Sequence, residues 1–197
     1  MSKIVIAYHS GYGHTARIAE HIASGARGAG AEVELVKVDA ITDEGWQKLD
    51  AADAIVFGAP TYMGGASAQF KAFEDATATR WFNQVWSGKL AAGFSNSGSP
   101  SGDKLSTLVQ LILFAQQHGM LWQGLGVMPN EHPAGNEFVS KQALNRLGSF
   151  AGLLTQANND APENTFTPGD LKTAELFGAN IAVTASKLSG IELAAAN

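Results

Sequence analysis

The chain alternates short apolar segments with longer segments whose apolar residues recur at helical spacing. Residues 3–8 (KIVIAY) form an almost continuous apolar run, which is typical of a strand that is covered on both faces. Over residues 18–26, Ile and Ala then recur three and four positions apart, and this stripe ends at Gly28 and Gly30, as a helix would. A strand–helix repeat of this kind predicts parallel strands joined by right-handed crossovers.

Five strands are predicted along the chain. They cover residues 3–8, 33–38, 54–58, 90–94 and 120–123. Further helices are predicted from near Ser67, from Gly102 and over residues 170–188. The helix that starts at Gly102 is predicted to bury one apolar face, formed by Leu105, Leu108, Ile112 and Ala115. We therefore expect an α/β fold in one domain spanning residues 1–197, an open doubly wound parallel sheet of five strands with helices on both faces.

One long segment, from about residue 124 to 168, does not follow this pattern. Its Pro and Asn residues interrupt any regular period, so it is predicted to be a loop excursion from the domain. A loop of this length in a compact domain is usually functional or disordered, and we expect a lid or a subunit contact.

Composition excludes several classes of function. The hydrophobic and charged fractions, 45% and 16%, are those of a globular domain, and the absence of cysteine excludes a disulfide framework and thiolate metal sites. No metal site is predicted. A net charge of −5 without a basic stripe argues against nucleic acid as a partner. Because the sequence has neither an apolar run of ~20 residues nor the layout of a signal peptide at its start, we expect no membrane span and a cytoplasmic location.

The loop after the first strand, HSGYGHT, has the composition of a phosphate-binding turn. Its glycines let successive N–H groups point inward, and the following helix adds a partial positive charge at its N-terminus. The spacing Gly11-x-Gly13-x-x-Ala16, with Asp39 ending the second strand, also fits the dinucleotide-binding variant. The alternative is a tight turn that is packed for its own sake. The residues predicted to form the cup are Ser10, Gly11, Tyr12, Gly13, His14 and Thr15.

Two further loops follow strands at the same edge of the sheet, where ligands of open α/β folds bind. After the third strand, GAPTYMGG presents Tyr62 and Met63 as a flat surface that suits an aromatic ring system, or these side chains pack only against their neighbours. After the fourth strand, SNSGSPSGD offers N–H and O–H groups to the polar edge of a heterocycle, or is a flexible surface loop.

Four stretches of the sequence resemble the flavodoxin-like NAD(P)H:quinone oxidoreductases, the group historically called tryptophan-repressor-binding protein, WrbA. They are KIVIAYHSGYGHTARIAEHIASG, GAPTYMGGASAQFKAFEDAT, GKLAAGFSNSGSPSG…QQHGM and GDLKTAELFGANIAVTASKLSG. The resemblance covers residues 3–119 and 168–190. It implies a flavodoxin-like fold with strand order 2-1-3-4-5, non-covalently bound FMN, and two-electron reduction of quinones at the expense of NAD(P)H by a ping-pong hydride transfer. It also implies a homodimer or homotetramer.

The resemblance assigns the three loops to parts of FMN. The first loop would hold the phosphate. The second would line the isoalloxazine with Pro60, Thr61, Tyr62, Met63 and Gly64. The third would bond the pyrimidine edge with Asn96, Ser97, Gly98 and Ser99, reaching to Gly102.

The chain departs from the family in four places. The third loop is one residue longer and the segment after the second strand is shorter than in many members, and the other two departures are substitutions at predicted site residues. Tyr62 and Met63 stand where the family usually has Arg and Phe, and Gln117 replaces the His that normally approaches the flavin. Candidates for stabilising charge on reduced FMN are therefore backbone N–H groups of the third loop, Gln117 and His118. His132 could enter the site and protonate a quinone, or is a solvated loop residue. Trp81 matches a substrate-stacking Trp of the family in approximate place, or packs in the core or at an interface.

Two other functions fit the same three loops. A flavodoxin-type carrier would pass single electrons to a protein partner, and such carriers are usually far more acidic than this chain. A flavin-binding sensor would bind the cofactor without turnover.

Overall fold

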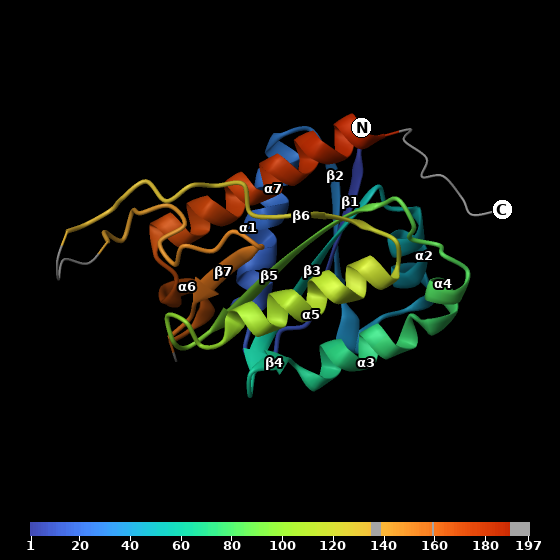
Figure 1. Ribbon diagram of the computed structural model, residues 1–197, viewed down its shortest axis with the longest axis horizontal. Coiled ribbons are helices and arrows are strands. Elements are labelled where there is room, and N and C mark those ends of the chain that lie inside the picture. The colour runs from blue at the N-terminus through green and yellow to red at the C-terminus, as the bar shows by residue number, and fades with distance from the viewer. Residues whose placement is uncertain (135–138, 159, 190–197) are drawn as a thin grey trace.

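The computed structural model describes all residues except 135–138, 159 and 190–197 (Figure 1). Its centre is a parallel sheet in which β1 (Lys3–Tyr8), β2 (Glu32–Lys37), β3 (Ala54–Tyr62), β5 (Leu90–Ser97) and β6 (Leu121–Gln123) stand in the order β2-β1-β3-β5-β6. These are the five predicted strands in the predicted order, so the flavodoxin-like topology is confirmed. All of these strands end at one edge of the sheet, which we call the carboxyl edge.

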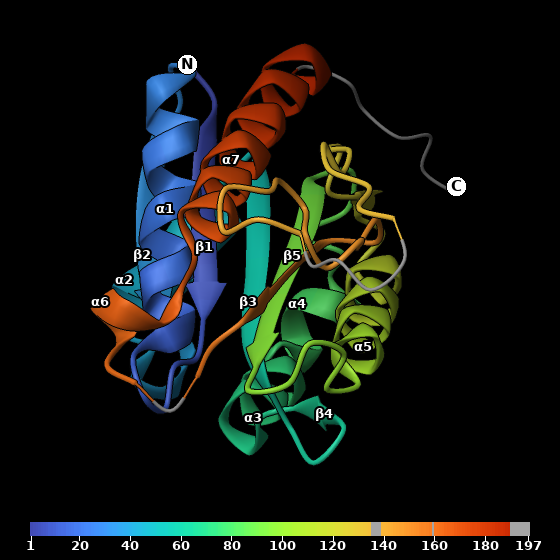
Figure 2. The same ribbon diagram turned by 90° about the vertical axis from the view of Figure 1, so that its left-hand side faces the viewer.

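The segment predicted as a long loop excursion contains two short elements of its own. Strand β7 (Leu153–Gln156) pairs in parallel with the last part of β5, residues 94–97, whereas β6 pairs with residues 90–92. Strands β6 and β7 thus lie end to end beside β5, and residues 124–152 are an insertion between them. After β7 comes the short helix α6 (Pro162–Thr165). Together with β7, it returns the chain to the carboxyl edge (Figure 2).

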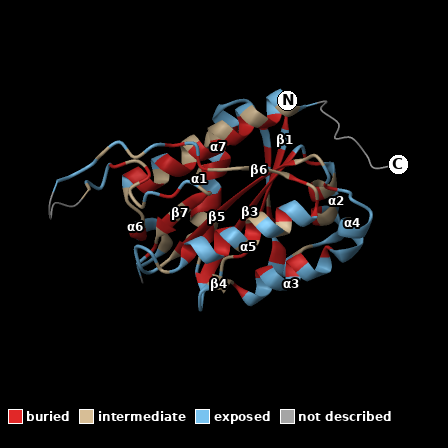
Figure 3. Cartoon of the chain, viewed as in Figure 1, coloured by how far each residue is buried: buried red, intermediate tan, exposed pale blue. Residues whose placement is uncertain are grey.

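Helices cover both faces of the sheet. Helices α1 (His14–Gly28) and α7 (Pro168–Leu188) lie side by side on one face (Figure 2), where they bury Ile4 and Ile6 of β1. Helices α2 (Asp43–Ala51), α3 (Ala68–Ala76) and α5 (Lys104–Gln117) cover the other face, where they bury Val5 and Ala7. Because side chains alternate across a strand, the continuous apolar run of β1 serves both cores. The central strands are accordingly coloured as buried in Figure 3.

The contact between α1 and α7 depends on glycine. A Cβ on Gly25 would collide with the carbonyl of Glu175, and a Cβ on Gly178 would collide with the carbonyl of Ile22. The two backbones can therefore approach only because both positions lack a side chain. Helix α7 begins at Pro168, two residues before the predicted segment 170–188, and the Thr167 hydroxyl caps it by accepting a hydrogen bond of 3.2 Å from the N–H of Asp170.

Helix α5 buries a different face from the one predicted. Leu108 and Ala115 are buried as expected, but Leu105 is exposed and Leu111 takes its place in the core. Apolar residues lie on most of the circumference of this helix, so their spacing in the sequence did not identify the face that is buried.

The remaining elements are the 3-10 turn η1 (Val38–Ala40), the two-residue strand β4 (Gly65–Ala66), which pairs antiparallel with the end of β3, and α4 (Ala78–Phe82). None of the helices in the described ranges is both long and apolar enough to cross a bilayer.

Candidate functional site

A pocket of about 570 Å³ opens at the carboxyl edge of the sheet, and we call it the carboxyl-edge pocket. Eleven of the sixteen residues predicted to bind the cofactor line it, and they come from all three predicted loops. These are Ser10, Gly11, Tyr12, His14, Thr15, Pro60, Thr61, Tyr62, Asn96, Ser97 and Gly98. The lining is completed by Ala157, Asn158, Asp160, Ala161 and Pro162, which follow β7 and were not predicted.

The first loop presents backbone donors at the start of α1. Gly13 is the N-cap residue with φ 88°, and it provides no side-chain cap for the helix. The Ser10 hydroxyl accepts a hydrogen bond of 3.1 Å from the N–H of Ala16 and so closes the loop. Within the described part of the chain, the N–H groups of residues 12–15 have no acceptor. Unpaired amides at a helix N-terminus form a site for an anion such as a phosphate.

Hydroxyl and amide groups tie the first loop to the third, and the second loop to β5 and α5. Thr15 donates a hydrogen bond of 2.7 Å from its hydroxyl to the Asn96 side-chain oxygen, and both residues are buried. The Thr61 hydroxyl lies 2.8 Å from the Ser95 hydroxyl and 2.7 Å from that of Thr107. These hydrogen bonds orient the polar side chains at the floor of the pocket.

Two tyrosines form the outer wall of the pocket. The rings of Tyr12 and Tyr62 meet edge to face, with centroids 6.4 Å apart and planes at 69°. Burial raises the pKa of Tyr62, so its phenol stays neutral at physiological pH. Met63 was predicted to share this surface, but it is fully exposed at the tip of the β3–β4 turn, where Met63 and Gly64 both have positive φ. The turn geometry thus points Met63 away from the pocket.

The unpredicted wall after β7 closes over the first loop. The His14 Nε2 atom lies 2.9 Å from the carbonyl oxygen of Asp160. Because a carbonyl can only accept, Nε2 must carry the hydrogen. Pro162 lies over Gly13, where a Cβ would approach the proline ring to 2.7 Å. Gly13 thus lies behind Pro162 and does not itself line the pocket.

The third loop is held from behind by a lysine that sequence reasoning missed. Lys104, at the start of α5, is fully buried and contacts Ser97, Ser99 and Pro100. Ser99 and Gly102 do not line the pocket. Ser99 is exposed and turns its carbonyl oxygen toward Lys104, and Gly102 packs against the Ser97 hydroxyl. The signal in the sequence was a single lysine in the first turn of a helix, which is normally a solvent-exposed position.

The structure places Trp81, Gln117 and His118 in a second hollow, of about 470 Å³, among α3, α4 and α5, which we call the helix-end groove. Gln117 is the last residue of α5, a 14-residue helix that begins at the third loop, and His118 follows it. Such a helix is about 21 Å long, so it carries these residues away from the carboxyl-edge pocket of the same chain. Within one chain, the structure therefore does not bring Gln117, His118 or Trp81 to the pocket where they were predicted to lie beside the flavin and the substrate. His132 is exposed and lines neither hollow.

His118 is a buried core residue. Its ring lies 4.6 Å from that of Trp86, and its Nε2 atom is 2.9 Å from the Thr77 hydroxyl. Thr77 uses its own hydrogen in a 2.6 Å bond to the carbonyl of Glu74, so Nε2 of His118 must be the donor. Burial lowers the pKa of His118 to about 4, and the side chain is therefore neutral at pH 7.

Comparisons with known proteins identify a family. The model of the family described as NADPH-dependent FMN reductase matches residues 4–131. Flavodoxin FldP of Pseudomonas aeruginosa is 42% identical and is aligned over 92% of this chain and 96% of its own. An NAD(P)H dehydrogenase (quinone) of Archaeoglobus fulgidus is 32% identical over 95% of this chain and 100% of its own. A crystal structure of a flavodoxin, WrbA-like protein from Agrobacterium tumefaciens superimposes with a TM-score of 0.74 at 41% identity, and covers 95% of this chain and 99% of its own.

Proposed function

The chain belongs to the NADPH-dependent FMN reductase family, and on this premise we propose that it is an FMN-dependent NAD(P)H:quinone oxidoreductase with its cofactor in the carboxyl-edge pocket. The main support for this proposal is that three features line one pocket of about 570 Å³. They are the unpaired amides at the N-terminus of α1, a polar floor and two tyrosines. Cofactor pockets typically measure about 300–1,000 Å³.

The residues present fit FMN in both chemistry and arrangement. The amides of residues 12–15 match a phosphate, and Ser10 and Thr15 flank them. Asn96 and Ser97 offer polar groups to the edge of a heterocycle, and Tyr62 offers an aromatic face or edge to a flat ring system. Anion donors and an aromatic wall thus line the same pocket, as a molecule that carries both a phosphate and a flat ring requires.

Bound FMN would supply the redox chemistry, accepting a hydride from a nicotinamide and passing two electrons to a quinone. The protein residues bind and orient the reactants, and no side-chain nucleophile is needed. Tyr12 is exposed at the mouth of the pocket, so nicotinamide and quinone can approach the same open side in turn. That geometry supports a ping-pong cycle. The cytoplasm supplies NAD(P)H, and we place the protein there as part of this proposal.

The proposal is tested first by the colour of the purified protein. We expect a flavin absorbance spectrum, and release of a compound with the mass of FMN on heating. A protein that is colourless, and stays so after incubation with FMN, would overturn the proposal.

The alternative of an electron carrier is favoured by one observation, the 42% identity with a protein named Flavodoxin FldP. Anaerobic stopped-flow mixing separates the two functions. For the oxidoreductase we expect NAD(P)H alone to bleach the visible flavin absorbance and a quinone to restore it. A flavin that is reduced only through a separate reductase protein would favour the carrier, and one that neither NAD(P)H nor a reductase reduces would favour a sensor.

The proposal includes a homodimer or homotetramer, and the outer face of α5 supports it. Leu105, Val109 and Leu113 recur every four residues on this face and are 57%, 44% and 61% exposed. A continuous apolar stripe on a helix favours contact with another apolar surface. We expect Val109→Asp to lower the oligomeric state in analytical ultracentrifugation, whereas Val183→Asp on α7 should not. A monomeric parent protein would contradict this part of the proposal.

A further inference from the structure

Lys104 makes three hydrogen bonds, all to the third loop. Its ammonium nitrogen lies 3.0 Å from the Ser97 hydroxyl, 2.7 Å from the Ser99 carbonyl oxygen and 3.0 Å from the Pro100 carbonyl oxygen. A lysine ammonium has three N–H donors, and each has an acceptor here. The side chain therefore fixes the conformation of the loop from inside the protein.

The contact with Ser97 determines what this hydroxyl can do in the pocket. Its oxygen accepts from Lys104, so its own hydrogen is the group that remains for a ligand. The other neighbour of the hydroxyl is the Ser99 carbonyl oxygen at 3.4 Å, which is longer than the usual ~2.5–3.0 Å for an O–H···O bond. Ser97 lines the carboxyl-edge pocket, and it is therefore poised to donate a hydrogen bond into it.

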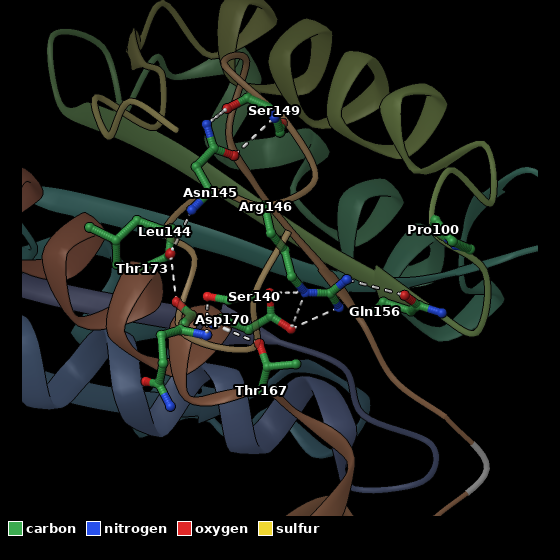
Figure 4. A network of polar contacts seen from close by, with 12 residues as sticks. Pro100, Ser140, Leu144, Asn145, Arg146, Ser149, Gln156, Thr167, Asp170 and Thr173 are labelled. Carbon is green, nitrogen blue, oxygen red and sulfur yellow. Dashed lines mark hydrogen bonds and ion pairs between the residues drawn. The ribbon is translucent and has the colours of Figure 1, made fainter. Parts of the chain in front are cut away.

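In the part of the chain that the structure describes, no carboxylate forms an ion pair with Lys104. The nearby carboxylate is Asp170, which Arg146 grips with bonds of 2.9, 3.1 and 2.9 Å (Figure 4). Arg146 also reaches Gln156, whose amide donates a 3.1 Å bond to the Gly98 carbonyl. The cluster of Lys104, Arg146 and Asp170 thus holds two positive charges and one negative charge behind the third loop.

Burial and the neighbouring guanidinium act on Lys104 in the same direction. Desolvation first, and then repulsion from Arg146, lower the pKa of Lys104 to about 8. The ammonium is still mostly protonated at pH 7. Burying a cation that is hydrogen-bonded but not neutralised by a carboxylate lowers the stability of the folded protein. An electron-rich group of a ligand, bound in the carboxyl-edge pocket beside Ser97, would offset this cost.

We propose that Lys104 is a positioning residue for bound FMN, which aims the Ser97 hydroxyl into the pocket and places an uncompensated positive charge behind it. The inference rests on the proposed function. Two-electron reduction near neutral pH gives the flavin ring a negative charge that the oxidised ring lacks. Lys104 therefore stabilises the reduced state of the cofactor more than the oxidised state, and raises its midpoint potential.

The test compares a buried lysine, Lys104, with a half-buried one, Lys89, in the holoprotein. Lys104→Met removes the charge behind Ser97. Lys89→Met is the matched control, because Lys89 also donates to carbonyl oxygens, those of Asp50 at 2.6 Å and Ala52 at 2.7 Å, but lies at the opposite edge of the sheet. The readouts are the midpoint potential by dye equilibration and the FMN dissociation constant by flavin fluorescence.

We expect Lys104→Met to weaken the preference for reduced over oxidised FMN about tenfold, which lowers the potential of a two-electron couple by about 30 mV. Lys89→Met should leave the potential unchanged. If Lys104→Met does not fold, Lys104→Gln removes the charge and keeps two N–H donors for the loop. A fall in the midpoint potential of the same size in Lys104→Gln supports the proposal.

An unchanged potential in a folded, FMN-bound Lys104 variant would overturn this inference and leave the proposed function intact. Equal shifts in the Lys104 and Lys89 variants would also overturn it, since they would indicate a general effect of losing a lysine. Failure of the parent protein to bind FMN would instead overturn the proposed function.

Discussion

Two hollows of the molecule are lined with polar side chains, yet their unpaired groups are opposite in hydrogen-bonding character. The carboxyl-edge pocket receives the start of α1, with the unpaired amides of residues 12–15. The helix-end groove lies among α3, α4 and α5, where α3 and α5 end, and within the described residues two buried acceptors there, an oxygen of Glu74 and Nδ1 of His118, have no partner. The unpaired groups of the first hollow are donors, and those of the second are acceptors.

This difference follows from the direction of the chain. In a parallel sheet with helical crossovers, helices begin at the carboxyl edge and end at the amino edge. Helix N-termini expose N–H groups and a partial positive charge, whereas C-termini expose carbonyl groups and a partial negative charge. An anionic cofactor therefore has a favourable site at only one edge, even though both hollows are of similar volume, about 570 and 470 Å³.

The largest effect that tests this comparison is expected from a single methyl group on the first loop. Gly13→Ala adds a Cβ that would approach Pro162 to 2.7 Å, at a residue with φ 88°. To relieve this contact the loop must leave the conformation that aligns its amides. We expect FMN affinity to fall about 100-fold, which is about 2.7 kcal/mol. The measurement is fluorescence titration of the apoprotein with FMN.

Gly30→Ala is the control for Gly13→Ala. Gly30 has nearly the same backbone angle, φ 89°, but nothing lies within 4 Å of its Cβ position. Both variants should lose about 1–2 kcal/mol of stability, the usual cost of a left-handed residue. Comparable losses of FMN affinity in the two variants would show that backbone strain, and not the geometry of the first loop, is responsible.

Sequence patterns predicted the parts of this fold that depend on local periodicity. Each central strand is buried on both faces, so its apolar run could be recognised, and the glycine loop after β1 has an intrinsic turn chemistry. The three loops could be placed together because parallel strands that are neighbours must end at the same edge. That argument needs no knowledge of side-chain contacts.

The rest of the site depends on contacts between distant segments. Strand β7 has four residues and, among the described residues, pairs with β5 alone, so nothing local marked it. The wall formed by residues 157, 158 and 160–162 was missed with it. The predicted placement of Gln117 and His118 beside the flavin came from the resemblance, and within one chain these residues lie in the helix-end groove instead. The length of α5 alone argues against the predicted placement, since the helix starts at the third loop and carries its own end to the opposite edge.

His118, which lines the helix-end groove, is expected to make the stability of the protein depend on pH. The pKa of His118 is lowered from 6.5 to about 4 in the folded protein. As pH falls from 6.5 towards 4, the unfolded chain takes up a proton that the folded protein does not bind, so the free energy of unfolding decreases. Between pH 7 and 5 this single group should cost about 1–2 kcal/mol.

Urea unfolding with FMN in excess at both pH values measures this effect. His118→Phe keeps an aromatic ring between Trp86 and Phe114 but cannot titrate, so it should lose about 1–2 kcal/mol less than the parent protein over the same interval. Equal losses in the two proteins would show that His118 takes up its proton in the folded state near its ordinary pKa.

The smallest expected effect compares two glutamines, one at each edge. Gln156 donates a 3.1 Å hydrogen bond to the Gly98 carbonyl and so supports the third loop, whereas Gln117 is exposed in the helix-end groove. Gln156→Ala should weaken FMN binding about three- to tenfold, the worth of one hydrogen bond of about 0.5–1.5 kcal/mol. Gln117→Ala should leave binding unchanged in the same titration. Because both variants shorten a glutamine to alanine, a difference between them can be attributed to the position of the residue.

A loss of FMN affinity in Gln117→Ala would mean that the helix-end groove contributes to the cofactor site, through a second copy of the chain or otherwise. The two hollows would then not be separate in function.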